Sequence, residues 1–426
     1  MTANKNDVIY DVHDKPPVGM WVGLSFQHLF AMFGATVLVP ILVGIDPAIA
    51  LFSSGLGTLA HLSVTKYKIP AYMGSSFAYI LAMQSLMKSD GIAAVAQGAV
   101  VGGFVYLLVA LIVKFVGKGW IDKVLPPIVV GPIVMVIGLS LAGTAVNDAM
   151  NKNGEYNLTF LMISLVTLFA VLAFNMFGKG LTSLIPILLG IIVGYVFTLI
   201  VQKITGTTII SFDEISKSAW LDVPKFDIMF VDYHFKLYPS AILTMAPIAF
   251  VTMTEHFGHV MVLNSLTGND YFKDPGLDRT LTGDGLAQII AGFFGAPPVT
   301  SYGENIGVMA VTRVYSTIVF VIAGVFAIFL GLSPKFGAVI HTIPTAILTG
   351  ASIVVFGLIT IAGAKIWIEN KVDFSKNKNL MVAAVTIILG TGDFALQFGN
   401  FNLGGIGTAT FAALILNWFF SLADKS

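Results

Sequence analysis

The sequence predicts an all-α polytopic membrane protein, with about fourteen transmembrane segments in two inverted repeats of seven. Three observations predict this fold. Hydrophobic residues make up 56% of the 426 residues and charged residues only 11%, whereas a soluble domain carries about 25% charged residues. Apolar stretches long enough to cross a bilayer recur along the chain. Two segments that are interrupted by proline and glycine occupy matching places in the two halves.

The apolar stretches define the segments. A bilayer core needs about 20 apolar residues per helix. Eleven stretches are clear spans: 22–41, 46–64, 92–114, 124–146, 156–177, 181–202, 239–262, 315–332, 337–361, 379–392 and 403–422. Three further segments are short or interrupted: 69–87, 282–296 and 299–312. Counting these three as irregular crossings gives about fourteen passes.

The basic residues predict the orientation. An even number of passes places both termini on one side, and if that side is the cytoplasm, sixteen Lys and Arg residues lie inside and seven outside. Four of the outer seven lie in or beside the loop 203–238, and long loops count least in the positive-inside rule. We therefore expect cytoplasmic termini and an extracellular loop over 204–238, which could form a short hairpin. Residues 1–20 lack the features of a signal peptide, so the first helix should insert uncleaved.

The composition also excludes several classes of protein. The formal net charge is zero and there is no cysteine, so we expect no nucleic-acid partner, disulfide, thiol catalysis or thiolate metal site. The sequence has no phosphate-binding loop, dinucleotide fingerprint or nucleophile elbow. We therefore expect neither a cofactor nor enzyme activity, and the lipid bilayer is the partner that composition implies.

The two broken segments are the most informative feature. Residues 69–79 read IPAYMGSSFAY and interrupt the third pass, and residues 296–307 read APPVTSYGENIG and interrupt the tenth. Each has proline, small polar residues and an aromatic residue near glycine. Seven passes per half give the halves opposite orientations. Backbone outside a helix cannot face lipid with unpaired N–H and C=O groups, so the pair should line the central site of a transporter.

Few acidic residues fall inside the predicted spans. Glu255 and His259 lie four residues apart on the eighth pass and therefore share one helix face, and Glu304 lies in the tenth pass. A carboxylate within the membrane is costly and marks a functional site. Two carboxylates near one histidine predict a proton relay, because imidazole exchanges protons near neutral pH.

Other polar residues near these spans receive structural interpretations. The order Glu-His-x-x-His at 255–259 differs from the zinc-protease order His-Glu-x-x-His, and no separate ligand cluster accompanies it, so we expect no metal. His256 points away from Glu255 on a helical wheel. We expect His256, and His28 of the first pass, to connect helices. The depth of Asp284 is left open.

Four motifs resemble the nucleobase–ascorbate transporter family. Residues 304–313, ENIGVMAVTR, are similar to its signature, which is Gln, Glu or Pro, then Asn-x-Gly, four more residues, Thr and usually a basic residue. The signature positions after Glu304 are Asn305, Gly307, Thr312 and Arg313. The stretches similar to the first, third and eighth helices of the family are 27–40, 68–78 and 255–259. The resemblance covers nearly the whole chain and is closest to bacterial uracil permeases.

The resemblance implies more about the architecture. Residues 1–426 would form one transporter unit. The first four segments of each repeat would form a core domain, at about 15–120 and 239–332, and the last three a gate domain, at about 121–203 and 333–426. Segments three and ten would each contain a short strand that faces its counterpart at mid-membrane. Family members are proton symporters of the cell membrane and often dimerise through their gate domains.

The resemblance also implies a pocket. In the family it is lined by the glutamate and histidine of the eighth helix, the glutamate of the tenth and the aromatic residue of the third. These correspond to Glu255, His259, Glu304 and Phe77. Gly303 would donate its backbone amide and Tyr302 would form a wall. The function that follows is proton-coupled import of uracil by alternating access, because these groups match the two N–H donors and two carbonyl acceptors of the ring.

Three other classes stay open. A purine (xanthine or urate) symporter would share the architecture, although Glu rather than Gln at position 304 favours uracil. An anion transporter of similar fold would need a positive site, and the two broken segments contain no Lys or Arg. A membrane-embedded enzyme would need a nucleophile or a metal set. The sequence also leaves open whether Na⁺ replaces H⁺, although the Glu/His cluster favours H⁺.

Overall fold

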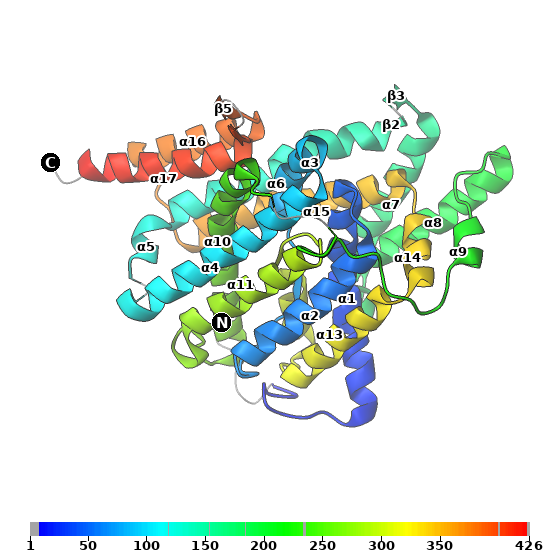
Figure 1. The fold of residues 1–426 in the computed structure, drawn as a ribbon, viewed down its shortest axis with the longest axis horizontal. Helices are drawn as coiled ribbons and strands as arrows, with labels where there is room; N and C mark the ends of the chain where they lie inside the picture. Colours follow the sequence, from blue (N-terminus) through cyan, green and yellow to red (C-terminus); the bar gives the residue numbers. More distant parts are fainter. Residues whose placement is uncertain are drawn as a thin grey trace.

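The structure is a computed structural model that describes residues 8–423, apart from 118, 153, 184, 233–235 and 399–400. The chain is mainly helical and forms two halves (Figure 1). The first half contains α1 (Val18–Val43), α2 (Pro47–Val64), β1 (Met73–Ser75), η2 (Phe77–Tyr79), α3 (Ile80–Ser89), α4 (Ile92–Val116), α5 (Ile121–Val124), α6 (Pro127–Met150), β2 (Asn151–Lys152), β3 (Glu155–Tyr156), α7 (Leu158–Phe177), η3 (Gly180–Ser183), α8 (Pro186–Thr205) and α9 (Asp213–Lys217). The second half contains α10 (Pro239–Thr267), η4 (Phe272–Gly276), α11 (Leu277–Phe293), β4 (Val299–Ser301), α12 (Gly303–Thr312), α13 (Thr317–Gly331), α14 (Pro334–His341), α15 (Thr345–Glu369), α16 (Asn377–Thr391), β5 (Leu396–Phe398), β6 (Phe401–Leu403) and α17 (Gly405–Ala423).

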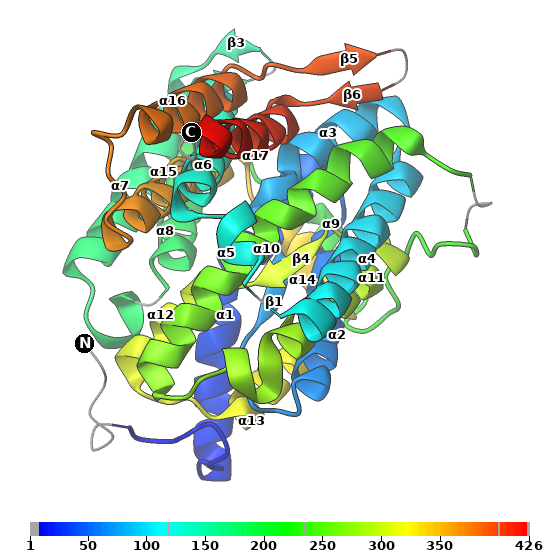
Figure 2. The same ribbon diagram turned by 90° about the vertical axis from the view of Figure 1, so that its left-hand side faces the viewer.

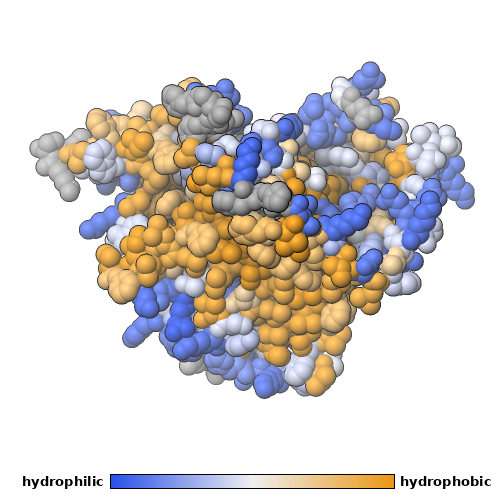
Figure 3. Space-filling model, in the orientation of Figure 1, coloured by the Kyte–Doolittle hydropathy of each residue, from blue (hydrophilic) through white to orange (hydrophobic). Residues whose placement is uncertain are grey.

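The outer surface of the helices is apolar. Among the described residues, eight helices are long and apolar enough to cross a membrane, or nine if the bent pair α13 and α14 is one span. Phe169 and Phe177 of α7 are 63% and 81% exposed. In Figure 3, hydrophobic residues cover a broad area across the middle of the face. Such a surface suits lipid rather than water. This confirms the predicted polytopic membrane protein, while the count of about fourteen segments stays a prediction.

The packing of the helices repeats between the halves. α4 packs against α11 and α13 packs against α2, which are equivalent contacts when the halves are exchanged. In the same way α7 packs against α8, α16 packs against α17, and α6 packs against its own counterpart α15. β1 and β4 form an antiparallel pair near the centre of the molecule (Figure 2). An inverted repeat predicts this exchange of equivalent contacts.

The structure corrects one predicted span. The span 337–361 is not one helix, because α14 ends at His341 and α15 begins at Thr345. Pro344 lies between them, and proline has no N–H and disfavours a helical residue before it. The short hairpin that the sequence allows in the loop 203–238 falls partly on residues 233–235, which lie outside the described residues. The amides of Asp222 and Met229 donate to the carbonyls of Leu332, just after α13, and Phe293, the last residue of α11.

Glycines allow α6 and α15 to approach closely. A Cβ atom placed on Gly138 of α6 would lie 2.2 Å from the carbonyl oxygen of Phe356 on α15. A Cβ on Gly363 of α15 would lie 2.5 Å from the carbonyl oxygen of Gly131 on α6. Small residues at such crossings let helix backbones pack directly in a membrane. The glycines inside the predicted spans thus determine the helix–helix spacing at this crossing.

An ion pair outside the long spanning helices should make stability depend on pH. Asp46, which caps α2, lies 3.6 Å from His341 Nε2 at the end of α14. The contact between these two groups raises the pKa of His341 and lowers the pKa of Asp46. The pair therefore stabilises the fold between these two pKa values, and its contribution is lost as the pH rises through the pKa of folded His341. The effect should be small, because both side chains are nearly half exposed.

The measurement is thermal unfolding in detergent across about pH 6 to 8, where histidine titrates. The chain is expected to lose stability relative to a His341→Gln variant as the pH rises. A His13→Gln variant, which replaces an exposed histidine, is the control and should follow the unmutated chain. Parallel stability curves for the chain and His341→Gln would contradict the prediction.

Candidate functional site

The two broken segments meet at the centre of the molecule. β1 pairs with β4 in antiparallel register, with Gly74 opposite Thr300. Each strand runs into a helix, because Phe77 begins η2 and Gly303 begins α12. The first N–H groups of a helix have no partner inside that helix. The short strands predicted in segments three and ten are therefore present, and each is followed by amides that a ligand can use.

A cavity of about 490 Å³ lies beside the ends of these strands. A smaller space of about 70 Å³ adjoins it and shares Glu255 and Glu304 as lining residues. Cavities in this range hold small molecules. Together the two spaces bring together all six residues predicted for the pocket: Phe77, Glu255, His259, Tyr302, Gly303 and Glu304.

Two carboxylates and one imidazole line the cavity, beside neutral Ser, Thr, Asn and Tyr side chains. Neither Lys nor Arg is among the described residues that line the two spaces. Glu304 lies in the first turn of α12, where the helix dipole favours a negative charge, and it is exposed to the cavity. The Nδ1 atom of His259 lies 3.1 Å from the hydroxyl of Ser301. The cavity therefore offers hydrogen-bond acceptors and exchangeable protons rather than a positive site.

One end of the larger cavity reaches the connection between α7 and α8. This end is lined by Asn175 near the end of α7, Ser183 in the connection and Pro186 at the start of α8. The same connection carries Lys179, which the distribution of basic residues predicts to lie in the cytoplasm. The cavity therefore lies toward the side that the sequence predicts to be inside.

Tyr302 forms a fixed wall of the smaller space. Its hydroxyl donates to the carbonyl oxygen of Ser75 at 2.7 Å and accepts from Thr36 Oγ1 at 3.2 Å. A Cβ on Gly74 would lie 2.5 Å from the tyrosine ring, so the absence of a side chain there lets the ring lie against β1. Because the hydroxyl is already paired, Tyr302 presents its ring rather than a hydrogen-bond donor.

The signature residues have separate structural places. The side-chain amide of Asn305 donates to the carbonyl oxygen of His28 at 3.0 Å and to its Nδ1 atom at 3.2 Å, which connects α12 to α1. Gly307 lines the cavity. Thr312 is the last residue of α12, and Arg313 follows it with a left-handed φ of 55°. Of these residues, only Gly307 lines the cavity.

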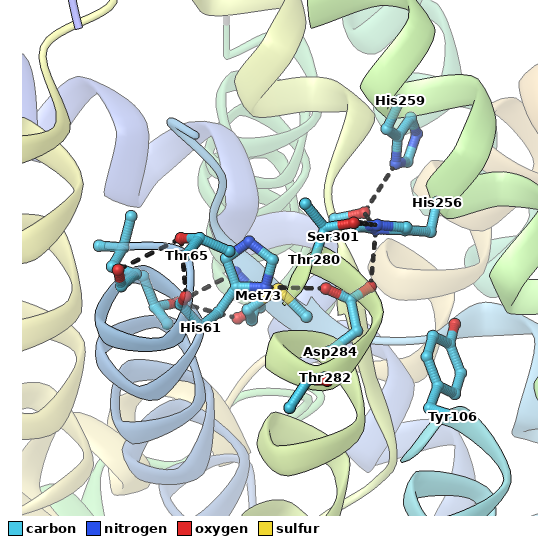
Figure 4. A network of polar contacts seen from close by, with 12 residues as sticks. His61, Thr65, Met73, Tyr106, His256, His259, Thr280, Thr282, Asp284 and Ser301 are labelled. Carbon is cyan, nitrogen blue, oxygen red and sulfur yellow. Dashed lines mark hydrogen bonds and ion pairs between the residues drawn. The ribbon is translucent and has the colours of Figure 1, made fainter. Parts of the chain in front are cut away.

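The structure places a buried polar cluster next to the pocket that the sequence did not predict as a unit. Asp284 on α11 lies between His61 on α2 and His256 on α10, with an Nδ1 atom 2.9 Å from each carboxylate oxygen (Figure 4). The sequence contained only a weak indication that these three residues form a cluster. Gly283 and Gly285 flank Asp284, which predicts close helix contact, but nothing in the sequence relates position 284 to position 61.

Two other features bear on the choice of site. Among the described residues, no group of three or more His, Asp or Glu side chains is arranged to hold a metal ion. A separate cavity of about 510 Å³ lies between α3 and the start of α10, where it is lined by Asp90 and Lys236. None of the six predicted pocket residues lines it, so the central cavity is the candidate site.

Two halves with equivalent helix contacts, whose broken segments meet at a central cavity, define a membrane transporter. Residues 19–398 match the model of a family described as the Permease family. The chain belongs to this family, the nucleobase–ascorbate transporters that the signature resembles. It is therefore a transporter and not an enzyme.

The relatives agree with this assignment, and two solved structures share the fold. The uracil permease of Bacillus caldolyticus is 45% identical over 97% of this chain and 94% of its own length. The uracil permease of Bacillus subtilis is 44% identical over 97% and 95%. The transmembrane domain of the cyanobacterial bicarbonate transporter BicA shares the fold with a TM-score of 0.61 at 13% identity, over 94% of this chain and 97% of that one. The murine anion transporter Slc26a9 gives 0.70 at 11% identity, over 96% and 69%.

Proposed function

We propose that this chain is a proton-coupled symporter that imports uracil across the cytoplasmic membrane by alternating access. The uracil permeases at 44–45% identity over nearly the whole chain support the substrate. The observation that carries the proposal is the composition of the cavity. Glu255 and Glu304 line it together with the first residue of η2, Phe77, and the first residue of α12, Gly303.

These groups complement a uracil ring. The two carboxylates can accept hydrogen bonds from the two N–H groups of the ring, and the amides at Phe77 and Gly303 can donate to its two carbonyls. The rings of Phe77 and Tyr302 can pack against the ring of the substrate. An analogue with another donor pattern would leave buried polar groups unpaired, which is the strongest source of discrimination in a polar pocket.

The proton would bind to the cluster of Glu255, His259 and Glu304. A proton on this cluster reduces the repulsion between two carboxylates that line one cavity, so it stabilises the substrate-bound state. The core domain, at about 15–120 and 239–332, would then move against the gate domain, at about 121–203 and 333–426. Because the cavity reaches the connection between α7 and α8, the structure fits an inward-open state.

The membrane arrangement is part of the same proposal. It comprises fourteen segments, both termini in the cytoplasm, the loop 204–238 outside and a homodimer through the gate domains. The excess of basic residues on one side supports the orientation. Family resemblance supports the dimer and the division into core and gate.

Two alternatives differ in their predicted substrates. A xanthine or urate symporter is disfavoured by Glu rather than Gln at position 304. An anion transporter is suggested by the fold shared with BicA and Slc26a9, but a fold can host several functions. The described lining of the cavity contains no Lys or Arg that would hold an anion.

The test is uracil counterflow and uptake in proteoliposomes with an imposed pH gradient. We expect counterflow of labelled uracil, and faster uptake when the outside is acidic. Thymine, xanthine and urate are added as competitors, and chloride is removed in a parallel sample. Stronger competition by xanthine or urate than by unlabelled uracil would favour the purine alternative. Loss of uptake without chloride would favour the anion alternative, and uptake that ignores the pH gradient would overturn proton coupling.

A further inference from the structure

The buried cluster at Asp284 lies outside the proposed pocket. His61, Asp284 and His256 come from α2, α11 and α10, and their side chains are at most 2% exposed. Each carboxylate oxygen of Asp284 is 2.9 Å from one imidazole Nδ1 atom. No Lys or Arg pairs with Asp284 in the described part of the chain. An unpaired carboxylate is strongly unfavourable in such a place, so the two histidines must supply the compensating hydrogen bonds and charge. We call these three residues the buried triad.

His61 can hold one proton only. Its Nδ1 atom faces Asp284, while its Nε2 atom is buried and has no hydrogen-bond partner in the described structure. A proton on Nε2 would therefore have no acceptor, which is unfavourable in a dry interior. The consistent state of His61 is neutral, with its proton on Nδ1 and donated to Asp284.

His256 can hold two protons. Its Nδ1 atom faces Asp284 and its Nε2 atom lies 2.9 Å from the hydroxyl of Thr280. That hydroxyl donates to the carbonyl oxygen of Leu277, so its lone pair is free to accept from a proton on Nε2. With protons on both nitrogens, His256 is an imidazolium that balances the charge of Asp284. If the hydroxyl rotates to donate to Nε2, the neutral ring is also satisfied.

The triad is connected to the pocket by one hydroxyl. Ser301 Oγ lies 3.4 Å from His256 Nδ1 and 3.1 Å from His259 Nδ1. Figure 4 shows this connection from Asp284 through His256 and Ser301 to His259. If Ser301 accepts from the Nδ1 proton of His256, it can donate its own proton to His259. The proton of His259 then sits on Nε2, which lies near Gly303 at the cavity.

We propose that the buried triad is a second protonation site of the transporter, and that the Nδ1 proton of His256, which Asp284 holds in place, determines through Ser301 the tautomer that His259 presents to the substrate. The proposal rests on the proposed function, because it assumes that His259 contacts the substrate. It makes Asp284 and Ser301 positioning residues rather than pocket residues.

The other ionisable groups around Asp284 limit the interpretation of any pH effect. They come from α10, which carries Glu255 and His259, and from α4, which carries Tyr106. Glu255 lies in the proposed pocket. A pH effect on uracil binding is therefore assigned to the triad only if it depends on Asp284 and is accompanied by a change at His256.

The first experiment observes the histidines directly. The full-length chain is labelled with ¹⁵N-histidine, reconstituted in lipid, and studied by solid-state NMR between about pH 6 and 8, where free histidine titrates. Variants that each replace one histidine assign the signals. We expect an imidazolium at His256, a neutral Nδ1–H ring at His61 and a neutral Nε2–H ring at His259. A neutral His256 throughout this range would overturn the proposal, and no mutation at Asp284 is needed to see it.

The second experiment measures uracil binding against pH for three variants. Asp284→Asn removes the negative charge and replaces one of the two carboxylate acceptors by an NH₂ donor, so the Nδ1 proton of His256 is no longer held in place. The apparent Kd for uracil at neutral pH should then rise on the order of tenfold, a typical coupling between two sites, and its pH profile should shift. Ser301→Ala should weaken binding while His256 remains an imidazolium. Asp278→Asn, on the same helix but in its first turn, is the control and should bind as the unmutated chain.

The outcomes distinguish failure of the proposed function from failure of the proposed role of the buried triad. If the unmutated chain does not bind uracil, the proposed function fails, while the NMR spectrum still tests the protonation of the triad. If Asp284→Asn binds uracil with the pH profile of the unmutated chain, the triad is only a brace. If Asp284→Asn does not fold, the Ser301→Ala variant tests the proposal. Uracil affinity equal to that of the unmutated chain, together with an unchanged His259 tautomer, would show that Ser301 does not connect the triad to the pocket.

Discussion

Replacing Glu255 by glutamine is expected to abolish proton-driven uracil uptake. The carboxylate lines both parts of the cavity, where it can accept an N–H of the ring and bind a proton. Glutamine keeps the shape of the side chain but cannot take up a proton. Its NH₂ group can also point toward an N–H of the uracil ring, which places two hydrogen-bond donors opposite each other. A hydrogen bond to a charged group contributes about 1.5–3 kcal/mol, so uracil binding should weaken by about ten- to a hundredfold. Glu255→Ala should remove detectable binding.

The measurement is uracil binding and uptake in proteoliposomes with an acidic exterior. Glu369→Gln is the matched control, because Glu369 is exposed at the end of α15, where it pairs with Lys365. It should leave uptake unchanged. Glu304→Gln is measured in parallel and should also lose proton-driven uptake. Normal proton-coupled uptake by both Glu255→Gln and Glu304→Gln would show that the site assignment is wrong.

Replacing Gly138 by alanine is expected to destabilise the fold at the crossing of α6 and α15. The new methyl group would lie 2.2 Å from the carbonyl oxygen of Phe356 and 2.3 Å from the hydroxyl of Thr360. These atoms belong to α15 and are hydrogen-bonded to each other, so they cannot move aside independently. Overpacking of this kind costs about 1–3 kcal/mol. The helix crossing would have to widen, which changes how the two halves meet.

The control for this substitution lies on the same helix. Gly143 of α6 has no atom within 4 Å of the position that a Cβ would take. Gly143→Ala should therefore be neutral, or slightly stabilising because alanine favours a helix. Thermal unfolding of both variants in detergent, with and without uracil, gives the comparison. Equal stability of Gly138→Ala and Gly143→Ala would mean that the crossing tolerates a wider spacing than the structure shows.

The main features of the architecture were predictable because a bilayer constrains a sequence strongly. Each crossing needs a long apolar stretch, and non-helical backbone is tolerated only where protein or water surrounds it. The apolar spans therefore correspond to helices in the structure, and the proline and glycine runs at 69–79 and 296–307 correspond to the paired strands β1 and β4. The prediction was wrong at 337–361, where hydropathy continues across Pro344 but the helix does not.

The site was predictable only in part. Glu255 and Glu304 stand out in the sequence because carboxylates are rare in membrane spans. The structure brings them to one cavity with Phe77, Tyr302 and Gly303. Asp284 did not stand out, because α11 is short and contains several polar residues, and periodicity cannot show whether such a helix is buried. Nothing in the sequence around His61 marked it as part of a polar cluster.

The sequence by itself determined that this chain spans a membrane, that broken segments occupy matching places in its two halves, and which carboxylates lie in its spans. These properties follow from composition and from local order, which the bilayer selects one segment at a time. Only the tertiary structure decided which polar groups meet. His61 and Asp284 are 223 positions apart in the sequence, and only the packing of α2 against α11 places them 2.9 Å apart. A pairing of that kind depends on how helices cross, which no single segment encodes.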